Sequence, residues 1–172
     1  MQVKEELALV VRAQAGEREA LAQLWDAITP KLYGYLCHIL QERTLADDMV
    51  QQTWLKAMGA LPRFQSRGVR FSAWLFAIAR NECRQHWREN KHEIPLDPEL
   101  PLASPSSLHA IVEEKLLVEN ALRALSVEDQ DILRLRYLGD LSFQDIAAVL
   151  QISSVAARVR VHRALVRARA TF

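Results

Sequence analysis

The sequence predicts an all-α fold in which two small helical domains are joined by a flexible linker, and three observations support this prediction. Half of the 172 residues are hydrophobic, whereas only 5 are glycine and 6 are proline, a composition typical of helical proteins. Apolar residues recur with the period of an α-helix, and no alternating strand pattern competes with it. The stretch Lys91–Ser107 holds four of the six prolines and has neither period, so it is expected to be the linker.

The linker, residues 91–107, divides the chain into residues 1–90 and 108–172. Helix starts are marked by Thr29-Pro30, an N-cap followed by a first-turn proline, and by three segments with the form of a capping box. These segments are Thr44–Asp47, Ser126–Asp129 and Ser142–Asp145. We expect helices near residues 4–14, 17–28, 30–41, 45–60, 72–90, 108–125, 127–138, 142–150 and 154–170.

Composition argues against several classes of protein. No apolar run approaches the roughly 18–20 residues of a membrane span, so no membrane insertion is expected, and the N-terminal segment is too charged for a signal peptide. The two cysteines, Cys37 and Cys83, give no disulfide framework, which favours a reducing cytoplasm. No nucleophile–base pair, phosphate-binding glycine loop or carboxylate pair suggests catalysis, so no enzyme activity, catalytic residue, cofactor or metal is predicted.

The segment 142–170 has the pattern of a DNA-binding helix-turn-helix. A short helix, Ser142–Leu150, is followed by the turn Gln151–Ser153 and by a second helix, for which Ser153 is the expected N-cap. Gln151 stands where glycine is common, which costs up to about 1 kcal/mol if its φ is positive. The two helices are expected to pack through Ile146, Ala147, Leu150, Ile152, Ala157 and Val161.

The second helix of this pair has one apolar and one basic face. The apolar stripe consists of Ala157, Val161, Ala164, Leu165 and Ala168. The other face carries Arg158, Arg160, His162, Arg163 and Arg167 around Val159. Arginine pairs with phosphates or reads guanine, and a small apolar group can contact a thymine methyl. The alternative is a solvated basic face near a helix C-terminus, but the helix-turn-helix spacing favours DNA binding.

The predicted helix 45–60 combines a core side with an unusual outer side. Ala46, Met49, Val50, Thr53, Ala57 and Ala60 are expected to form the core side. The outer side places Leu55 among Asp48, Gln51 and Gln52, with Asp47 and Met58 at one border. An exposed leucine ringed by polar residues indicates a protein interface, but single surface leucines are common, and these residues alone leave both interpretations open.

The loop Phe64–Arg70 and the helix after it combine basic and aromatic residues. Arg80, Arg84 and Arg88 form a basic stripe, and Asn81, Gln85 and His86 add hydrogen-bonding groups, a combination that suits single-stranded nucleic acid. For Trp74 and Phe76, core packing is the favoured interpretation. Asn81 and the arginine stripe are the better contact candidates.

Together these segments resemble an extracytoplasmic-function (group IV) sigma factor of the sigma-70 family. Residues from about 20 to 90 resemble the helical bundle of sigma region 2, and residues from about 110 to 170 resemble region 4. The motifs that carry the resemblance are LADDMVQQTWLKAM, FSAWLFAIARNECRQHWR and the segment Ala121–Arg169. Three such segments in this order, with a linker between the second and the third, are strongly specific.

The resemblance implies an alternative sigma factor, active for example in a stress response, that binds core RNA polymerase and directs promoter-specific initiation. The implied partners are the β′ clamp helices and the β subunit of the polymerase, promoter DNA, and an anti-sigma factor that holds the chain inactive. Polymerase binding is implied for Asp47, Asp48, Gln51, Gln52 and Leu55. Binding of the -10 element is implied for Phe64, Arg67, Arg70, Arg80, Asn81, Arg84 and Arg88. Binding of the -35 element is implied for Arg158, Val159, Arg160, His162, Arg163 and Arg167.

Some positions depart from the family pattern, and two other classes of protein remain alternatives. Val155, Ala156 and Ala157 replace a frequent Gly-Thr-Val, and Gln52 stands where an acidic residue is frequent. The main alternative is a helix-turn-helix regulator that acts without polymerase. The second is a metal-dependent enzyme or metal sensor built on Cys83, His86 and His92, although their spacing fits no standard site.

Overall fold

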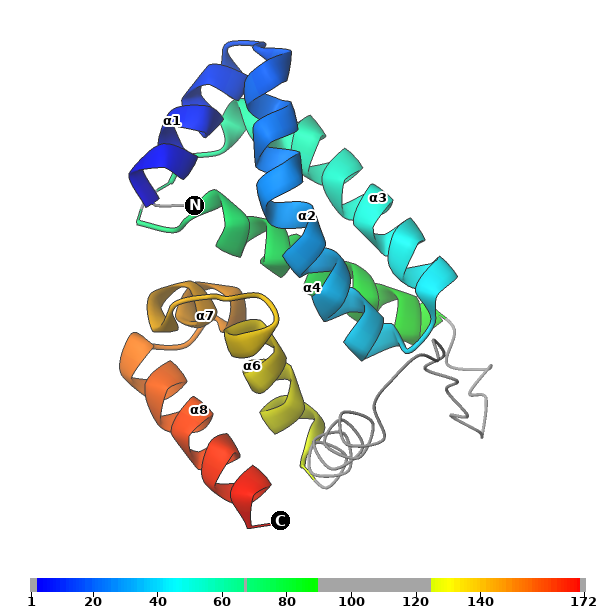
Figure 1. Ribbon diagram of the computed structural model, residues 1–172, viewed down its shortest axis with the longest axis vertical. Helices are drawn as coiled ribbons and strands as arrows, with labels where there is room; N and C mark the ends of the chain where they lie inside the picture. The colour runs from blue at the N-terminus through cyan, green and yellow to red at the C-terminus, as the bar shows by residue number, and fades with distance from the viewer. Residues whose placement is uncertain (1–2, 67, 90–124, 171–172) are drawn as a thin grey trace, which may run out of the picture.

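The computed structural model describes residues 3–66, 68–89 and 125–170, in which every regular element is a helix (Figure 1). The predicted all-α fold is therefore confirmed for the described residues. The N-terminal half, residues 3–89, contains α1 (Val3–Gln14), α2 (Arg18–Leu40), α3 (Arg43–Ala60), the 3₁₀-helix η1 (Leu61–Arg63) and α4 (Phe71–Glu89). The C-terminal half, residues 125–170, contains α6 (Val127–Tyr137), α7 (Phe143–Leu150) and α8 (Ser154–Arg169).

The predicted linker 91–107 lies outside the described residues, as does the helix predicted at 108–125 except for its last residue. Among the described helices, none has both the length and the apolar character needed to cross a membrane.

Buried aromatic rings hold the N-terminal half together. Tyr35 of α2, Trp54 of α3 and Phe76 of α4 are each at most 1% exposed. The Tyr35 and Phe76 ring centroids lie 5.2 Å apart, and Trp54 lies 6.0 Å from Phe71. Burying a large apolar side chain stabilises a fold by roughly 1.5–3 kcal/mol, and aromatic pairs add to this. These rings therefore fix α2, α3 and α4 against one another.

Helix α2 runs without interruption through Pro30, so the helix start predicted at Thr29-Pro30 is wrong. Leu24, Ile28, Leu32 and Leu36 form a continuous stripe on α2, and each is at most 3% exposed. Proline removes one backbone donor inside the helix, and burial of this stripe on both sides of Pro30 offsets that loss. The Thr29 hydroxyl, expected to cap a helix, instead accepts a hydrogen bond of 3.0 Å from Trp54 Nε1.

The start of α3 in the N-terminal half is fixed by packing and not by a side-chain cap. α3 begins at Arg43 after Glu42, which makes no side-chain capping bond, so the capping box predicted at Thr44 is wrong. Ala46, Met49 and Val50 in its first turns are buried, so packing fixes this end of the helix.

The C-terminal half has the predicted serine caps. Ser126, Ser142 and Ser153 each accept a backbone N–H bond from the residue three positions ahead, at 3.1–3.2 Å. The full capping box with Asp145 forms at Ser142. At Ser126 the N-cap bond is present, while the carboxylate of Asp129 contacts Arg167 of α8.

Helices α7 and α8 form the predicted helix-turn-helix pair. Ile146 of α7 and Ala157 and Ala164 of α8 are fully buried, and Val161 is 3% exposed. Gln151 in the turn has φ 55° and ψ 45°, so it adopts the left-handed conformation that glycine would adopt without strain. The apolar stripe predicted for the second helix faces the core.

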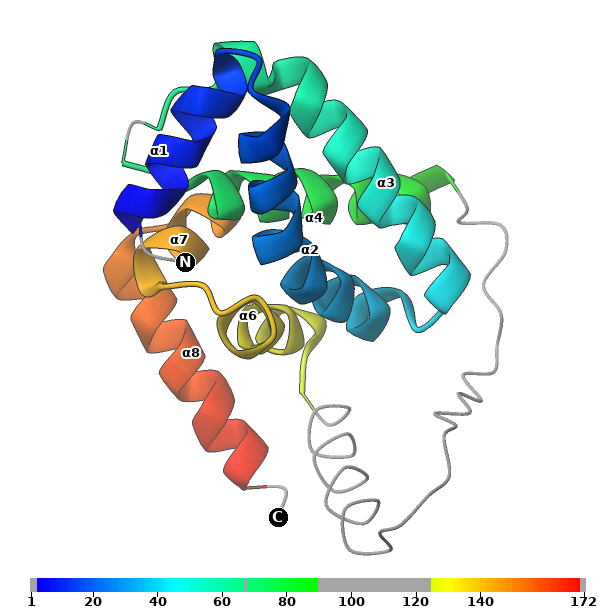
Figure 2. The ribbon, with the colours of Figure 1, turned by 45° about the horizontal axis from the view of Figure 1, so that its top comes forward.

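The two halves pack against each other, with α7 on α4 and α6 beside α2 (Figure 2). Gly139, just after α6, lies against the ring of Phe76. A Cβ atom at this position would come within 2.9 Å of that ring and within 2.8 Å of the Leu135 carbonyl oxygen. Glycine is required here because it permits this close approach between the halves.

Candidate functional site

The outer face of α3 is exposed as predicted. Leu55 is 64% exposed and Met58 is 39% exposed. The polar residues predicted around Leu55 are also exposed: Asp47, Asp48, Gln51 and Gln52. Lys56 joins this face to α4 through a 2.6 Å ion pair with Glu82. A cavity of about 340 Å³ between α3 and α4 is lined in part by Leu55 and Gln52.

The core face of α3 differs from the prediction at two positions. Ala60 is exposed, because the chain leaves the helix there and enters η1. Trp54, absent from the predicted core set, is 1% exposed and is the largest buried side chain of the helix. Its ring packs 5.0 Å from that of Trp25, between α2 and α3.

Phe64 and Trp74 line a cavity of about 650 Å³ at the start of α4. Their ring centroids lie 4.8 Å apart, and Phe64 meets Phe71 edge-on at 5.5 Å. The predicted core role of Phe76 is confirmed, whereas Trp74 is half-buried and reaches this cavity. The face of an aromatic ring beside an open space suits the stacking of an unpaired base. Ala148 and Gln151 of α7 also line the cavity.

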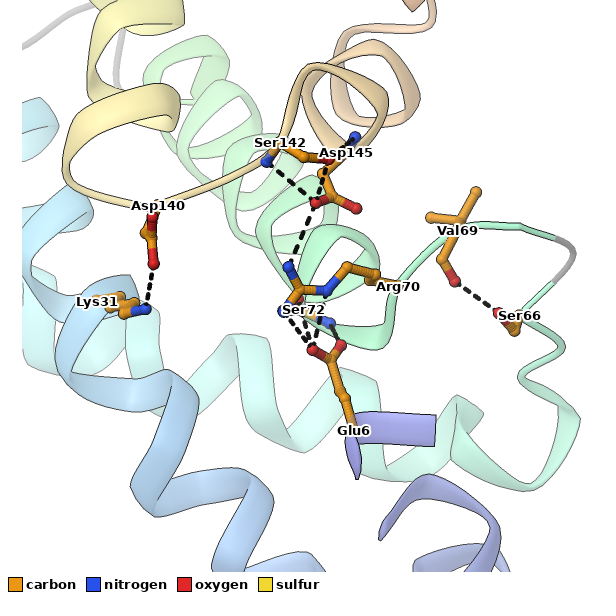
Figure 3. A network of polar contacts seen from close by, with 9 residues as sticks. All are labelled: Glu6, Lys31, Ser66, Val69, Arg70, Ser72, Asp140, Ser142 and Asp145. Carbon is orange, nitrogen blue, oxygen red and sulfur yellow. Dashed lines mark hydrogen bonds and ion pairs between the residues drawn. The ribbon is translucent and has the colours of Figure 1, made fainter. Parts of the chain in front are cut away.

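Gln14 of α1 fixes the loop that carries Phe64, and sequence reasoning missed it. Its Nε2 donates to the carbonyl oxygens of Leu61 and Phe64, at 2.9 and 2.8 Å. Ser66 Oγ donates to the Val69 carbonyl oxygen at 3.0 Å, which closes the loop on itself (Figure 3). Arg67, which the resemblance implies as a contact of the -10 element, lies outside the described residues.

Arg70 lies between two carboxylates that come from distant parts of the chain (Figure 3). Its guanidinium donates to Glu6 of α1 at 2.7 and 3.1 Å, and it lies 3.5 Å from Asp145 of α7. Burial alone would lower the pKa of Arg70, but the hydrogen bond and charge of Glu6, followed by Asp145, raise it. Arg70 is therefore held as a cation at the junction of three helices.

Glu6 was not predicted as a functional or core residue. It is 1% exposed, and besides Arg70 it accepts bonds from the backbone N–H and the hydroxyl of Ser72, at 2.6 and 3.1 Å. A buried carboxylate needs such partners to offset its desolvation. The sequence gives one indication of its burial, because Glu6 shares a helical face of α1 with apolar residues. Its partners lie more than 60 residues away in the chain, so local patterns do not identify them.

The arginine stripe predicted on α4 is divided by the C-terminal half. Arg84, Arg88 and Asn81 are exposed. Arg80 is instead half-buried, and its Nε donates to Asp131 of α6 at 2.7 Å. The other carboxylate oxygen of Asp131 accepts a 2.8 Å bond from the Tyr35 hydroxyl. Burial, followed by the charge of Asp131, raises the pKa of Tyr35 well above its usual value, so this hydroxyl remains a donor.

The basic face of α8 is exposed as predicted. This face consists of Arg158, Val159, Arg160, His162, Arg163 and Arg167, with Val159 41% exposed. Arg158 lies over the ring of Phe143, 5.5 Å from its centroid, and Arg167 contacts Asp129 of α6. Both ends of the basic face are thus oriented by the body of the C-terminal half, while Arg160, His162 and Arg163 project between them.

No group of three His, Cys, Asp or Glu side chains able to hold a metal ion occurs within the described ranges. Of the cluster considered from the sequence, His92 lies outside these ranges. Cys83 is 1% exposed, and its burial, followed by the Asp131 and Glu82 carboxylates, raises the pKa of its thiol to about 12. The thiol is therefore protonated, and it packs in the core as a small apolar group.

Comparison with known protein families matches both halves of the chain. A model of sigma-70 region 2 matches residues 24–93, and a model of sigma-70 region 4 matches residues 115–167.

Several bacterial sigma factors are similar over most of this chain. The ECF RNA polymerase sigma factor BldN of Streptomyces coelicolor is 30% identical over 167 residues, which cover 92% of this chain and 62% of BldN. The RNA polymerase sigma factor CarQ of Myxococcus xanthus is 29% identical, with 88% of each chain covered. The ECF sigma factor SigD of Mycobacterium tuberculosis is 30% identical, with 93% of this chain and 80% of SigD covered. The chain thus spans less than two thirds of BldN, but most of the other two.

Two solved structures share the arrangement of both halves. CnrH, in complex with the cytosolic domain of CnrY, superposes with a TM-score of 0.73 at 26% identity over 96% of each chain. RpoE from Bartonella quintana, in complex with the anti-sigma factor NepR, superposes with a TM-score of 0.67 at 26% identity, over 88% of this chain and 95% of RpoE.

Proposed function

The chain belongs to the extracytoplasmic-function RNA polymerase sigma factors, and we propose that it binds core polymerase through the outer face of α3 and brings two DNA-binding surfaces to a promoter. In this proposal the N-terminal half is region 2 and the C-terminal half is region 4. The chain itself carries out no chemical step. It contributes recognition, and the polymerase supplies catalysis.

The exposure of Leu55 is the observation that carries this proposal. A leucine that is 64% exposed, surrounded by the carboxylates and amides of Asp47, Asp48, Gln51 and Gln52, has the composition of an interface centre with a polar rim. This face fits a regulator that acts without polymerase less well. We assign it to the β′ clamp helices, and we assign the β subunit as a further contact of the bound chain.

The -10 surface consists of the aromatic cavity and the exposed part of α4. Phe64 and Trp74 offer stacking surfaces for a base taken out of the duplex, and Arg84 and Arg88 offer positive charge to the strand. Asn81, exposed on the same helix, offers both a donor and an acceptor to a base edge. Arg70 lies at the end of the loop beside the cavity, and Arg80 is half-buried on the same helix as Arg84 and Arg88. Arg67 and Arg80 are included in the proposed -10 contacts on the basis of the sequence.

The -35 surface is the basic face of α8. Arg160, His162 and Arg163 are exposed on the second helix of a helix-turn-helix, the helix that enters the major groove in this motif. Arg158 and Arg167 at the two ends of this face fit phosphate contacts, and Val159 fits a thymine methyl. Two surfaces on one chain gain affinity through effective concentration once the first is bound.

An anti-sigma protein is the further partner we propose, acting in the cytoplasm. The support comes from the two similar structures. In one, CnrH is bound to the cytosolic domain of CnrY, and in the other, RpoE is bound to the anti-sigma factor NepR. Such a partner would cover the polymerase and DNA surfaces of the free chain.

Transcription from a randomised promoter library, with bacterial core polymerase in the presence and absence of the chain, tests this function. Transcripts that start at defined sites only when the chain is present support it and reveal both promoter elements. If the chain shifts duplex DNA alone but neither binds core polymerase nor changes initiation, it is a helix-turn-helix regulator.

Substitution of Leu55 tests the polymerase face. Leu55→Asp places a charge at the centre of that face, and we expect a loss of core binding of roughly 2 kcal/mol or more, about 30-fold, as for an interface hot spot. Val127→Asp makes the same change at a residue of α6 that is 71% exposed, and it is expected to leave core binding unchanged. Equal binding of both variants and the wild type would show that α3 does not contact the polymerase.

A further inference from the structure

Helix α1 is bonded to both sides of the aromatic cavity, although it lies outside the part of the chain that matches the sigma-70 region 2 model. That match begins at residue 24, whereas α1 spans Val3–Gln14. α1 packs along α2, and its polar side chains reach the chain on either side of the cavity. Gln14 reaches the side that carries Phe64, and Glu6 reaches the start of α4.

Gln14 fixes the chain where it leaves η1. Its Nε2 donates at 2.9 Å to the carbonyl oxygen of Leu61, the first residue of η1, and at 2.8 Å to that of Phe64, the residue after η1. The Leu61 carbonyl oxygen also accepts the backbone N–H of Phe64 at 3.0 Å. An amide NH₂ group has two donors, and here both are used on the two ends of one helical turn. The direction in which Phe64 leaves η1 is therefore set by a side chain of α1.

Glu6 fixes the start of α4 (Figure 3). One carboxylate oxygen accepts the backbone N–H of Ser72 at 2.6 Å, and the other accepts from the Ser72 hydroxyl at 3.1 Å and from Arg70 at 2.7 and 3.1 Å. Ser72 lies in the first turn of α4, where backbone N–H groups have no partner inside the helix. Glu6 thus acts as an N-cap supplied by another helix, and at 1% exposure it is shielded from competing water.

The cavity lies between these two anchored parts of the chain. Phe64 comes from the part held by Gln14, and Trp74 comes from the helix whose start is held by Glu6. Aromatic stacking alone does not distinguish bases well, because every base has a π-face. Discrimination depends on the shape of the pocket and on the positions of its polar groups, which require a fixed backbone. The residues that fix the backbone therefore affect which base fits.

We propose that Gln14 and Glu6 are positioning residues for base recognition, which make no contact with DNA themselves but hold Phe64 and the start of α4 so that the cavity accepts one base of the -10 strand in preference to the others. The assignment of the cavity to the -10 strand rests on the proposed function. The anchoring of the cavity by α1 does not.

Gln14→Ala is the variant that tests this role. It removes both bonds to the chain after α3, and alanine is the best helix former, so α1 itself is kept. The side chain of Gln14 is only partly buried, so water can reach the two carbonyl oxygens that it leaves. Gln23→Ala makes the same change at an exposed position of α2 and is the matched control.

Transcription by the complete holoenzyme, from promoters randomised in the -10 and -35 elements, measures the base preference at each position. Gln14→Ala is expected to lower the preference at one or two positions of the -10 element by at least about threefold, the effect of losing one or two hydrogen bonds. Preferences in the -35 element, and all preferences of Gln23→Ala, are expected to equal those of the wild type. Base preferences that Gln14→Ala leaves unchanged, or lowers equally in both elements, overturn the proposal, because general destabilisation does not act on one element alone.

Hydrogen exchange of the free chain, followed by mass spectrometry, tests the anchoring without reference to function. Peptides that contain Phe64 are expected to exchange at least about threefold faster in Gln14→Ala than in the wild type and Gln23→Ala, whereas peptides of α8 are expected to be unchanged. Equal exchange in all three proteins overturns the proposal. If exchange is faster in Gln14→Ala but the wild type does not initiate transcription with core polymerase, the proposed function fails and the anchoring stands.

Glu6→Gln decides the matter if Gln14→Ala does not fold, as judged by circular dichroism. The amide keeps an oxygen for the Ser72 N–H and turns an NH₂ group toward Arg70, so the shape is preserved while the bond to Arg70 is lost. A loss of base preference confined to the -10 element supports the positioning role, and wild-type preferences overturn it.

Discussion

The two halves stabilise their helices by different means. In the N-terminal half, α2 and α3 have 23 and 18 residues, and each follows an N-cap glutamate that makes no side-chain capping bond. In the C-terminal half, α6, α7 and α8 have 11, 8 and 16 residues, and each follows an N-cap serine whose hydroxyl accepts a backbone N–H. The long helices without side-chain caps are stabilised by packing on aromatic rings. The shorter helices are stabilised in larger part by the hydrogen bonds at their N-termini.

Helix length explains this difference. The first four N–H groups of any helix lack internal partners, and in an 8-residue helix they are half of all the N–H groups. Short helices are marginal in isolation, so one satisfied donor is a larger part of their stability. In α3 the burial of Met49, Val50 and Trp54 contributes far more than a cap would, and Glu42 is tolerated at the cap position.

Loss of a buried ring in the N-terminal half is expected to have the largest effect. Trp54→Ala removes a side chain that is 1% exposed, together with its bond to Thr29, and should lower the free energy of unfolding by about 3–5 kcal/mol. Urea denaturation followed by circular dichroism measures this. Trp87→Ala, at a residue 45% exposed, is the control and should cost less than about 1 kcal/mol. Similar losses in the two variants would contradict the role of the aromatic core.

Loss of a cap should have a smaller effect that is confined to the C-terminal half. Ser142→Ala removes the capping-box bonds of α7 and is expected to cost about 1–2 kcal/mol in denaturant unfolding. Thr44→Ala changes an exposed residue in the first turn of α3 and should stay within about 0.5 kcal/mol of the wild type. A larger loss from Thr44→Ala would reverse the comparison between the halves.

Glycine is expected to have opposite effects at two glutamines of the helix-turn-helix. Gln151→Gly relieves a positive φ of 55° and should raise the midpoint of thermal unfolding, with a gain of about 0.5–1 kcal/mol. Gln144→Gly, in the exposed first turn of α7, should lower this midpoint, with a loss of about 1 kcal/mol in the free energy of unfolding. Shifts of the same sign would show that the turn conformation is not strained.

The exposed pair between the halves should contribute least. Lys31 and Asp140 have side chains 45% and 68% exposed, so Asp140→Asn is expected to change the stability by less than about 0.5 kcal/mol. Because Lys31 lowers the pKa of Asp140, any contribution is present above the unfolded-state pKa and disappears as the pH falls through the folded-state value. Denaturation of wild type and variant at neutral and acidic pH measures this. A difference that grows on acidification would contradict the sign.

Features determined by neighbours in sequence could be predicted from the chain. The serine caps, the left-handed turn at Gln151 and the two faces of α8 follow from residues within one or two helical turns. The exposed position of Leu55 follows from helical periodicity in the same way. Each depends on local geometry, which the order of residues specifies directly.

Features determined by distant partners could not be predicted. Pro30 and Thr29 have the local pattern of a helix start, yet packing of α2 on both sides and the indole of Trp54 keep the helix continuous. Arg80 has the same local pattern as Arg84 and Arg88, and only Asp131, 51 residues away, distinguishes it. Likewise, Glu6 acquires its role from Arg70, 64 residues away.

The positions of the tryptophans give the protein an optical signal for motion between its halves. All four, Trp25, Trp54, Trp74 and Trp87, lie in the N-terminal half. Trp74 borders the cavity that α7 helps to enclose, so separation of the halves brings water to its indole and shifts its emission to longer wavelength. Trp54 is 1% exposed in the core of the same half, so its surroundings do not change when the halves separate. Titration of the native chain with DNA can thus be followed in unlabelled protein.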